Sequence, residues 1–244
     1  MSWENEVKEI KKRLKLIQAM GGKEKIKRQY DAGRTTVRER IFALVDKGSF
    51  KEIGRLTGLS EYNEDGTLKS LMAVNSVIGH ALINKVPTVI YGDDFTIRGG
   101  AGDAAIYEKM ITAERFANEY RMPLIRLIEG TGGGGSVKSI EADGYTYVPA
   151  NPGWDWVVSN MATIPVVSLG LGPVAGLGAA RLVSSHYSVI VKKMSQVFVA
   201  GPPVVNRLGE TVTKESLGGS EIHGKNGVID EVADSEADAL AKAR

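Results

Sequence analysis

The first 45 residues of the chain carry apolar side chains at helical spacing among many lysines and glutamates. Gly21-Gly22 ends the first such stretch, and a second helix is predicted from Thr36 to Val45. The apolar positions of the first helix are Val7, Ile10, Leu14 and Ile17. The lysines of KEIKKRLK are interpreted as the solvated side of this helix, with a patch for a polyanion as the alternative.

From about residue 50 the apolar residues form short runs instead, which predicts strands. The runs are FKEIG, LMAVNSVIGHALI and VPTVIYGDDF. NEDG, from Asn63 to Gly66, is typical of a hairpin or loop. Asn84-Lys85 is expected to turn the chain between the second run and the third.

Three segments then repeat one form, in which a proline precedes a short apolar strand and a glycine cluster follows it. They are KVPTVIYGDDFTIRGGAG, RMPLIRLIEGTGGGG and TIPVVSLGLGPVAGLG. Helical patterns from Ala104 to Tyr120 and from Ala179 to Ser185 follow the first and third segments. Strands separated by helices favour parallel pairing through right-handed crossovers. The glycine clusters are therefore expected on one side of a wound α/β domain.

Composition narrows the class of protein. A length of 244 residues suits one large α/β domain or two small ones, and a net charge of +2 does not call for nucleic acid or an anionic membrane. The chain has no cysteine, which excludes disulfides and a thiol nucleophile. Its charged N-terminus is not a signal peptide, and no apolar run approaches the ~20 residues of a membrane span. We expect a soluble, cytoplasmic protein without a metal site.

The second glycine cluster, Gly130 to Gly135, formally matches the dinucleotide fingerprint G-x-G-x-x-G. That fingerprint requires an uninterrupted helix and then a strand that ends in an acidic residue. The residues that follow, SVKSIEADGYTYVPANPGWDW, are interrupted by proline and glycine, and no Gly-Lys-Ser/Thr of a P-loop is present. Neither nucleotide site is favoured, and a flexible linker is the simple alternative.

The third cluster indicates a different use of glycine. A helix is expected to begin at about Ala175 to Gly178, where its first amides have no partner within the helix. The loop from Thr131 to Gly134 would supply a second amide. Two amides aimed at one point form an oxyanion hole, which suits a thioester carbonyl that becomes an enolate. The alternative is tight packing of helix against strand at Gly176 and Gly178.

Five motifs follow one another along the chain: AGRTTVRERIFALVDKGSFKEIG, RGGAGDAAIYEKM, GPVAGLGAA, FVAGPPVV and ESLGGSEIHGKNGVID. In this order they resemble the N-terminal half of carboxyltransferase β subunits of biotin-dependent acyl-CoA carboxylases, of the propionyl-CoA and methylcrotonyl-CoA type. The resemblance implies the α/β fold of the crotonase superfamily (ClpP/crotonase-like), a spiral of ββα units with an N-terminal helical extension. Residues 1–48 would be a helical segment packed on an acyl-CoA-binding domain of residues 49–244.

The resemblance also implies a reaction and its residues. Carboxybiotin would release CO₂, the biotin ureido nitrogen would remove a proton from the acyl α-carbon, and the enolate would be carboxylated. Biotin would be the cofactor, carried by a partner, and an acyl-CoA thioester the substrate. The oxyanion hole would consist of backbone amides at Gly132, Gly133, Gly176 and Leu177. The coenzyme A channel would be lined by Arg98, Gly99, Gly100 and Ala101.

The expected partners are a C-terminal carboxyltransferase half or separate subunit, a biotin carboxyl carrier protein and a biotin carboxylase, within a homo- or hetero-oligomer. Family members usually contain both halves, so we expect either a fragment or a natural half-subunit. The family's usual arginine is replaced at Gly134. A carboxyacyl-CoA or acyl-carrier thioester decarboxylase subunit, and a non-catalytic assembly protein of the same fold, are the alternatives.

Overall fold

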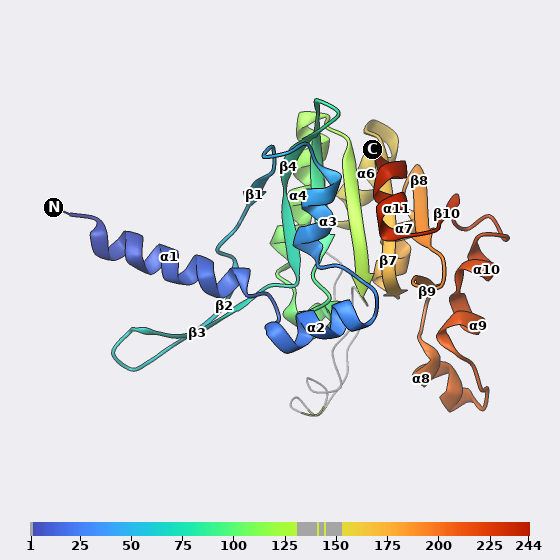
Figure 1. Ribbon diagram of the computed structural model, residues 1–244, viewed down its shortest axis with the longest axis horizontal. Coiled ribbons are helices and arrows are strands. Elements are labelled where there is room, and N and C mark those ends of the chain that lie inside the picture. The colour runs from blue at the N-terminus through green and yellow to red at the C-terminus, as the bar shows by residue number, and fades with distance from the viewer. Residues whose placement is uncertain (1, 131–140, 142–143, 145–152) are drawn as a thin grey trace.

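The computed structural model describes residues 2–130, 141, 144 and 153–244. Within these residues, one sheet has the strand order β1-β4-β5-β6-β7-β8-β10, with β9 paired to β7 (Figure 1). Strands β1, β4 and β5 are antiparallel neighbours, and the pairs from β5 to β10 are parallel. Their bounds are β1 Lys51–Ile53, β4 Ser76–Ile83, β5 Val86–Asp93, β6 Leu124–Gly130, β7 Val166–Ala175, β8 Tyr187–Val191, β9 Gln196–Phe198 and β10 Glu231–Ala233.

Helices cover both faces of this sheet. The α-helices are α1 Glu4–Gln18, α2 Lys23–Asp31, α3 Val37–Leu44, α4 Tyr107–Tyr120, α6 Trp154–Thr163, α7 Leu177–Val183, α8 Pro202–Val205, α9 Lys214–Gly218, α10 Ser220–His223 and α11 Glu236–Ala243. Short 3₁₀ turns are η1 Arg98–Gly100, η2 Gly102–Ala104 and η3 Asn206–Leu208. Helices α3 and α11 pack on one face through residues such as Ile41 and Leu240, and α4 packs on the other through Ala113 and Ala117.

The N-terminal helices agree with the periodicity, but the first of them is only partly packed. Helix α1 extends away from the sheet beside a hairpin of β2 (Gly58–Tyr62) and β3 (Leu68–Ala73) (Figure 1). Of its apolar stripe, Ile17 is buried against Ala73, whereas Val7 and Ile10 are about half exposed. The periodicity therefore predicts the helix correctly but not how much of its apolar stripe is buried.

The predicted strands are confirmed with one exception, and the structure adds β2, β8, β9 and β10, which the sequence pattern did not predict. The predicted hairpin joins β2 to β3, and Asn84 and Lys85 turn the chain with positive φ angles of 49° and 70°. The run LMAVNSVIGHALI was expected to form one strand, but it divides between β3 and β4. The division is at Asn75, because its side-chain amide donates to the Ala101 carbonyl at 2.8 Å. No described helix is long and apolar enough to cross a bilayer.

Candidate active site

Glycines of each of the three clusters, Gly99, Gly130 and Gly178, meet beyond the carboxyl ends of β5, β6 and β7. Gly130, the last residue of β6, has a φ of 127°, and a Cβ atom there would lie 2.8 Å from the Gly99 carbonyl oxygen. A Cβ atom on Gly178 would lie 2.9 Å from the carbonyl oxygen of Gly130. Backbone approaches this close require glycine. For the described glycines, the prediction that the clusters lie on one side of the domain is confirmed; residues 131–135 of the second cluster lie outside the described residues.

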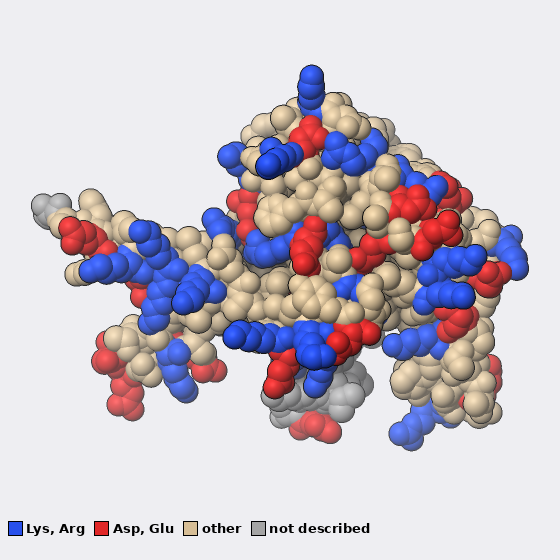
Figure 2. Space-filling model, viewed as in Figure 1, with Lys and Arg blue, Asp and Glu red and all other residues tan. Residues whose placement is uncertain are grey.

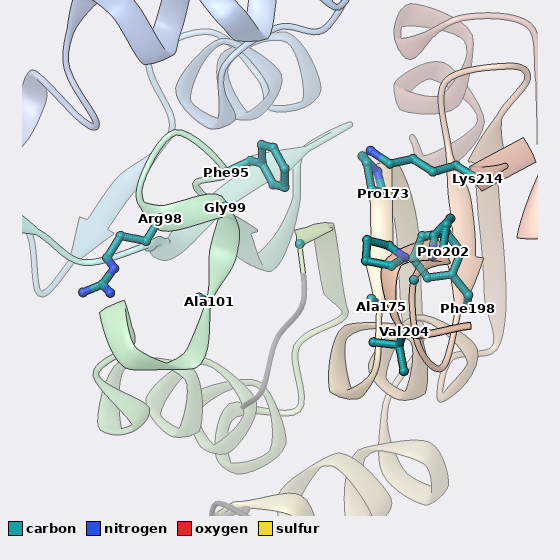
Figure 3. A pocket seen from close by; sticks show the side chains of 13 residues that line it. Phe95, Arg98, Gly99, Ala101, Pro173, Ala175, Phe198, Pro202, Val204 and Lys214 are labelled. Carbon is teal, nitrogen blue, oxygen red and sulfur yellow. The ribbon is translucent and has the colours of Figure 1, made fainter. Parts of the chain in front are cut away.

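A cavity of about 470 Å³ opens at this convergence (Figure 3). Phe95, Gly99 and Ala101 form one wall, and Pro173, Ala175 and Phe198 form the wall opposite. The lining is mostly apolar, and its charged members are Arg98 and Lys214. No carboxylate or imidazole lines it in the described part of the chain. Such a cavity suits an apolar group and offers it no acidic or histidine base.

A second hollow, of about 230 Å³, adjoins the first across the segment from Phe95 to Gly99. It shares Phe95, Arg98 and Gly99 with the cavity, and helix α2 adds Lys25 and Arg28. We call it the cationic hollow; its charged lining residues are Lys25, Arg28, Arg34 and Arg98. Lys and Arg side chains also gather along α1 and over α2 in Figure 2. The two hollows together suit an elongated ligand with an apolar end and an anionic end.

The predicted amide donors are only partly described. Gly132 and Gly133 lie outside the described residues. Gly176 precedes α7 with a φ of 55°, and its amide donates to the Phe198 carbonyl oxygen at 3.0 Å. That amide is therefore engaged and does not match the expectation of a free donor. The Leu177 amide has no hydrogen-bond acceptor among the described residues, and neither do the next two amides of α7, so it is the first of the donors that remain at this turn.

The predicted coenzyme A residues lie at the boundary between the two hollows. Arg98 and Gly99 line both hollows, Ala101 lines the cavity, and Gly100 is buried without lining either. Arg98 and the two glycines have positive φ angles of 51°, 62° and 71°. This tight turn brings the segment over Gly130. Three of these four consecutive residues thus line a hollow, and their role in binding coenzyme A stays a prediction.

Asp93, at the end of β5, supports the floor of the site. It accepts a hydrogen bond from the Tyr91 hydroxyl at 2.6 Å and another from the backbone amide of Glu129 at 3.2 Å. Burial raises the pKa of Asp93, and the Arg181 guanidinium only partly offsets that shift. Its contacts therefore tie β5 to the end of β6, next to Gly130.

Sequence reasoning missed several residues of this site. Phe95 and Phe198 form walls of the cavity, and Lys25 and Arg28 come from a helix that carried no predicted role. The aromatic residues gave no periodic or spacing signal. A stronger signal was overlooked in LIRLIEG, where Glu129 interrupts an apolar strand and is completely buried.

Comparison with known proteins gives a consistent result. Residues 28–244 match the family model of the carboxyl transferase domain. The chain is 31% identical over 246 residues to the mitochondrial methylcrotonoyl-CoA carboxylase beta chain of Dictyostelium discoideum, a match that spans 98% of this chain and 40% of that one. It is 28% identical to methylmalonyl-CoA decarboxylase subunit alpha of Veillonella parvula, over 96% of this chain and 46% of the relative.

A solved structure supports the fold. Transcarboxylase 12S, with methylmalonyl-coenzyme A and methylmalonic acid bound, superimposes with a TM-score of 0.81 at 25% identity, over 100% of this chain and 47% of that one. The crotonase-like spiral of ββα units with an N-terminal helical extension is thereby confirmed. The chain spans less than half the length of each of these three proteins.

Proposed function

The chain belongs to the carboxyl transferase domain family, and from that premise we propose that it is the acyl-CoA-binding half of a biotin-dependent carboxyltransferase. The observation that carries the proposal is the pair of adjoining hollows. The apolar cavity would take the acyl and pantetheine part of the substrate, and the cationic hollow its phosphate groups. Guanidinium groups such as Arg28 suit phosphate because they present several donors in a plane.

The chain's own residues would stabilise the enolate rather than form it. The thioester carbonyl would point to the Leu177 amide, whose hydrogen bond strengthens as negative charge develops on the oxygen. Pro173 and Phe198 would exclude water from the reacting carbon, which strengthens that hydrogen bond further. Gly132 and Gly133 remain the predicted second donor.

The composition of the cavity fits a cofactor that brings its own base. When bound, carboxybiotin supplies both the carboxyl group and the ureido nitrogen that accepts the α-proton. The described lining offers neither carboxylate nor imidazole, so none of its residues competes for that proton. Lys214 and Arg98 are the lining residues that carry charge; the Arg98 side chain extends away from the cavity, so Lys214 is the cation that can hold an anion near the opening (Figure 3).

The remaining features of the complex belong to the same proposal. Residues 49–244 would form the acyl-CoA-binding domain, with residues 1–48 packed on it. A C-terminal half or separate subunit, a biotin carboxyl carrier protein and a biotin carboxylase would complete the reaction in an oligomer. A cytoplasmic location stays a prediction from the sequence.

A decarboxylase is the second candidate, supported by the similarity to methylmalonyl-CoA decarboxylase subunit alpha. The same amide would stabilise the enolate that remains when a carboxyacyl-CoA loses CO₂. The two functions differ in their products. Net carboxylation of propionyl-CoA by the chain, assembled with its partners and bicarbonate, would favour the carboxylase. Loss of carboxylate from methylmalonyl-CoA without carboxylation would favour the decarboxylase, and neither activity would favour an assembly protein.

The first test is binding. We expect the purified chain to bind propionyl-CoA in a calorimetric titration, more tightly than propionyl-pantetheine, which lacks the nucleotide phosphates. NAD is the control ligand and is expected not to bind. Arg28→Ala should weaken propionyl-CoA binding and leave propionyl-pantetheine binding unchanged, because that side chain lines only the cationic hollow.

A cavity-filling variant tests the other hollow. Ala175→Leu should weaken both ligands about tenfold or more, since the added side chain occupies space that lines the cavity. Val158→Leu, on the exposed side of α6, is the matched control and should change neither. Equal binding of propionyl-CoA by all three variants would exclude the two hollows as its site.

A further inference from the structure

Strands β6 and β7 lose their regular pairing just before they reach the cavity. Ile128 pairs with Gly170, but Gly130, two residues later, pairs with Val174. Strand β7 thus inserts extra residues opposite Glu129, which makes an irregularity that we call the β7 bulge, Leu171 to Pro173. Bulges redirect the strand that contains them. This one matters here because Gly130, Pro173 and Ala175 all line the cavity.

The Glu129 side chain lies against the β7 bulge. It is completely buried, and a Cβ atom on Gly172 would lie 2.6 Å from its Oε1 atom. Its Oε2 atom accepts hydrogen bonds from Arg40 Nη1 and, at 2.7 Å, from Gln29 Nε2. The Arg34 Nε atom lies 2.9 Å from Oε1. One carboxylate therefore joins α2, the segment that follows it, and α3 to the end of β6.

Arg40 extends these contacts to β7 and α11. Its Nη2 atom donates to the carbonyl oxygen of Leu171 at 2.9 Å, inside the bulge, and its Nε atom donates to Glu236 Oε1 at 2.9 Å. Glu236 in turn accepts from the Thr35 amide at 3.0 Å and from the Thr35 hydroxyl at 2.6 Å. We call Arg40, Glu129 and Glu236 the bulge cluster.

A buried ion pair is weak evidence for stability by itself, because desolvation offsets much of the attraction. The bulge cluster differs from an ordinary buried ion pair because it contacts the part of β7 that is not regularly paired with β6. The Leu171 carbonyl lies where regular pairing stops, and Arg40 satisfies it. Without the Arg40 donor, the Leu171 carbonyl would be buried without a hydrogen bond. That cost would favour a different pairing register between β6 and β7.

We propose that Glu129 and Arg40 are positioning residues that hold the β7 bulge in one geometry and so set the distance between the ends of β6 and β7. If the proposed function holds, on which this inference rests, Glu129 and Arg40 aim the acyl carbonyl at the Leu177 amide without touching the substrate. The bulge cluster would thus govern recognition of the carbonyl, while the cavity walls and the cationic hollow govern binding of the rest of the ligand.

The test separates carbonyl recognition from binding in general. Propionyl-CoA and S-propyl-CoA, the thioether that lacks the carbonyl oxygen, are titrated into the wild-type chain and into Glu129→Gln. The wild type should prefer propionyl-CoA about tenfold, the worth of one good hydrogen bond. In Glu129→Gln this preference should fall to about twofold or less, with S-propyl-CoA affinity unchanged. An undiminished preference would overturn the proposal.

Glu114→Gln is the matched control. Glu114 is equally buried and is paired with Arg126, but its pairs involve the helix layer and not the bulge. It should lose stability while keeping the wild-type preference for the carbonyl. If both variants lose the preference equally, the effect is a general loss of stability and the positioning role is wrong.

Hydrogen exchange decides the question without a ligand. Backbone amides of residues 171–180 should exchange at least tenfold faster in Glu129→Gln than in Glu114→Gln, measured under conditions where both are folded by circular dichroism. Unchanged exchange there would contradict the proposal. If the wild type binds neither thioester nor thioether, the proposed function fails while exchange still tests the positioning role.

A second substitution covers the case in which Glu129→Gln does not fold. Arg40→Lys keeps the charge, but one ammonium nitrogen replaces the three guanidinium nitrogens that separately reach Glu236, Glu129 and Leu171. It should show the same faster exchange in residues 171–180 and the same lost preference. Glu129→Asp keeps the carboxylate and should restore part of the preference. An Arg40→Lys variant that behaves as wild type in both measurements would overturn the proposal.

Discussion

Strand β6 carries one buried charge toward each face of the sheet. Arg126 and Glu129 are three positions apart, so their side chains point to opposite faces, and both are completely buried. Glu129 belongs to the bulge cluster on the side of α3 and α11. Arg126 belongs to a second group, Arg126 with Glu114 and Arg181, which we call the helix-layer cluster.

The helix-layer cluster supports regular structure. Arg126 makes a two-pronged contact with Glu114, at 2.8 and 2.9 Å, and donates to the carbonyl oxygens of Arg181 and Ser184 at the end of α7. Burial by itself raises the pKa of Glu114, but the Arg126 and Arg181 guanidinium groups more than offset this and the net pKa is lowered. The cluster therefore satisfies the last carbonyls of a helix.

The two clusters show that burial of a charge does not by itself mark a functional role. Both clusters combine acidic and basic side chains, both are buried, and both donate hydrogen bonds to backbone carbonyl oxygens. They differ in the backbone that they hold. The helix-layer cluster stabilises a helix end whose carbonyl oxygens could also accept from other donors, whereas the bulge cluster holds a geometry that sheet pairing does not provide.

The largest effect is expected from Arg40→Met. This change leaves Glu129 and Glu236 buried without their shared cation, and loss of one partner from a buried pair costs about 3–5 kcal/mol. Urea unfolding at pH 7 measures it. Arg126→Met is the comparison and should cost less. It leaves one carboxylate, Glu114, which keeps Arg181 at 3.5 Å, whereas Arg40→Met leaves two carboxylates, of which Glu129 keeps Arg34 and Glu236 keeps no cation among the described residues. The reverse order would mean that the helix-layer cluster is the stronger of the two.

A smaller effect is expected from Gly172→Ala. The new methyl group would press on Glu129, so the free energy of unfolding should fall by about 2 kcal/mol and the preference for propionyl-CoA over S-propyl-CoA should fall with it. Gly170→Ala, two residues earlier in β7, meets only the movable ends of Ile190 and Leu182, at 3.1 Å each. It should keep the preference, and a loss there would assign the effect to β7 as a whole.

Removal of a buried charge that has no close partner should stabilise the protein, in contrast to the two preceding variants. Lys109 is buried, and no carboxylate lies within ion-pair distance of it among the described residues. Burial lowers its pKa to about 8, a shift that Glu52 only partly offsets. Lys109→Met should therefore raise the free energy of unfolding at pH 7 by about 1–2 kcal/mol, after allowance for residual screening.

The pH dependence of folding stability tests whether the buried charge of Lys109 is the cause. Between pH 8 and pH 10.5 the unfolded chain keeps the Lys109 proton that the folded chain has lost, so wild-type stability rises with pH there. The advantage of Lys109→Met should shrink over that range in urea titrations. An advantage that is constant with pH would show that the methionine gains stability by packing alone.

The smallest effect is expected from an exposed pair. Lys27 and Asp31 in α2 approach to 2.7 Å, but their side chains are 73% and 59% exposed. Water and salt screen such a pair. Lys27→Met should leave the urea midpoint within experimental error of the wild type, with Asp31→Asn as the companion variant. A clear loss in either would show that surface pairs also matter in this chain.

The sequence by itself determined the N-terminal helices, α4, α7, most strands and the convergence of the described glycines, but not α6 or the helices from α8 to α11. Periods of two and 3.6 residues follow from local backbone geometry, so β5, β6, β7 and α4 were predictable close to their observed bounds. Parallel crossovers have one hand, which placed the loops on a common side. Gly99, Gly130 and Gly178 meet there because only glycine permits such close approach.

Only the tertiary structure decided how those loops are held. The β7 bulge depends on Glu129, whose partner Arg40 lies 89 positions earlier, and Arg40 in turn meets Glu236, which lies 196 positions after it. The Gly176 amide was expected to be free, but β9 brings the Phe198 carbonyl to it. Periodicity records which face of an element is apolar. It does not record which distant group will satisfy a buried carboxylate or amide, because that depends on the path of the whole chain.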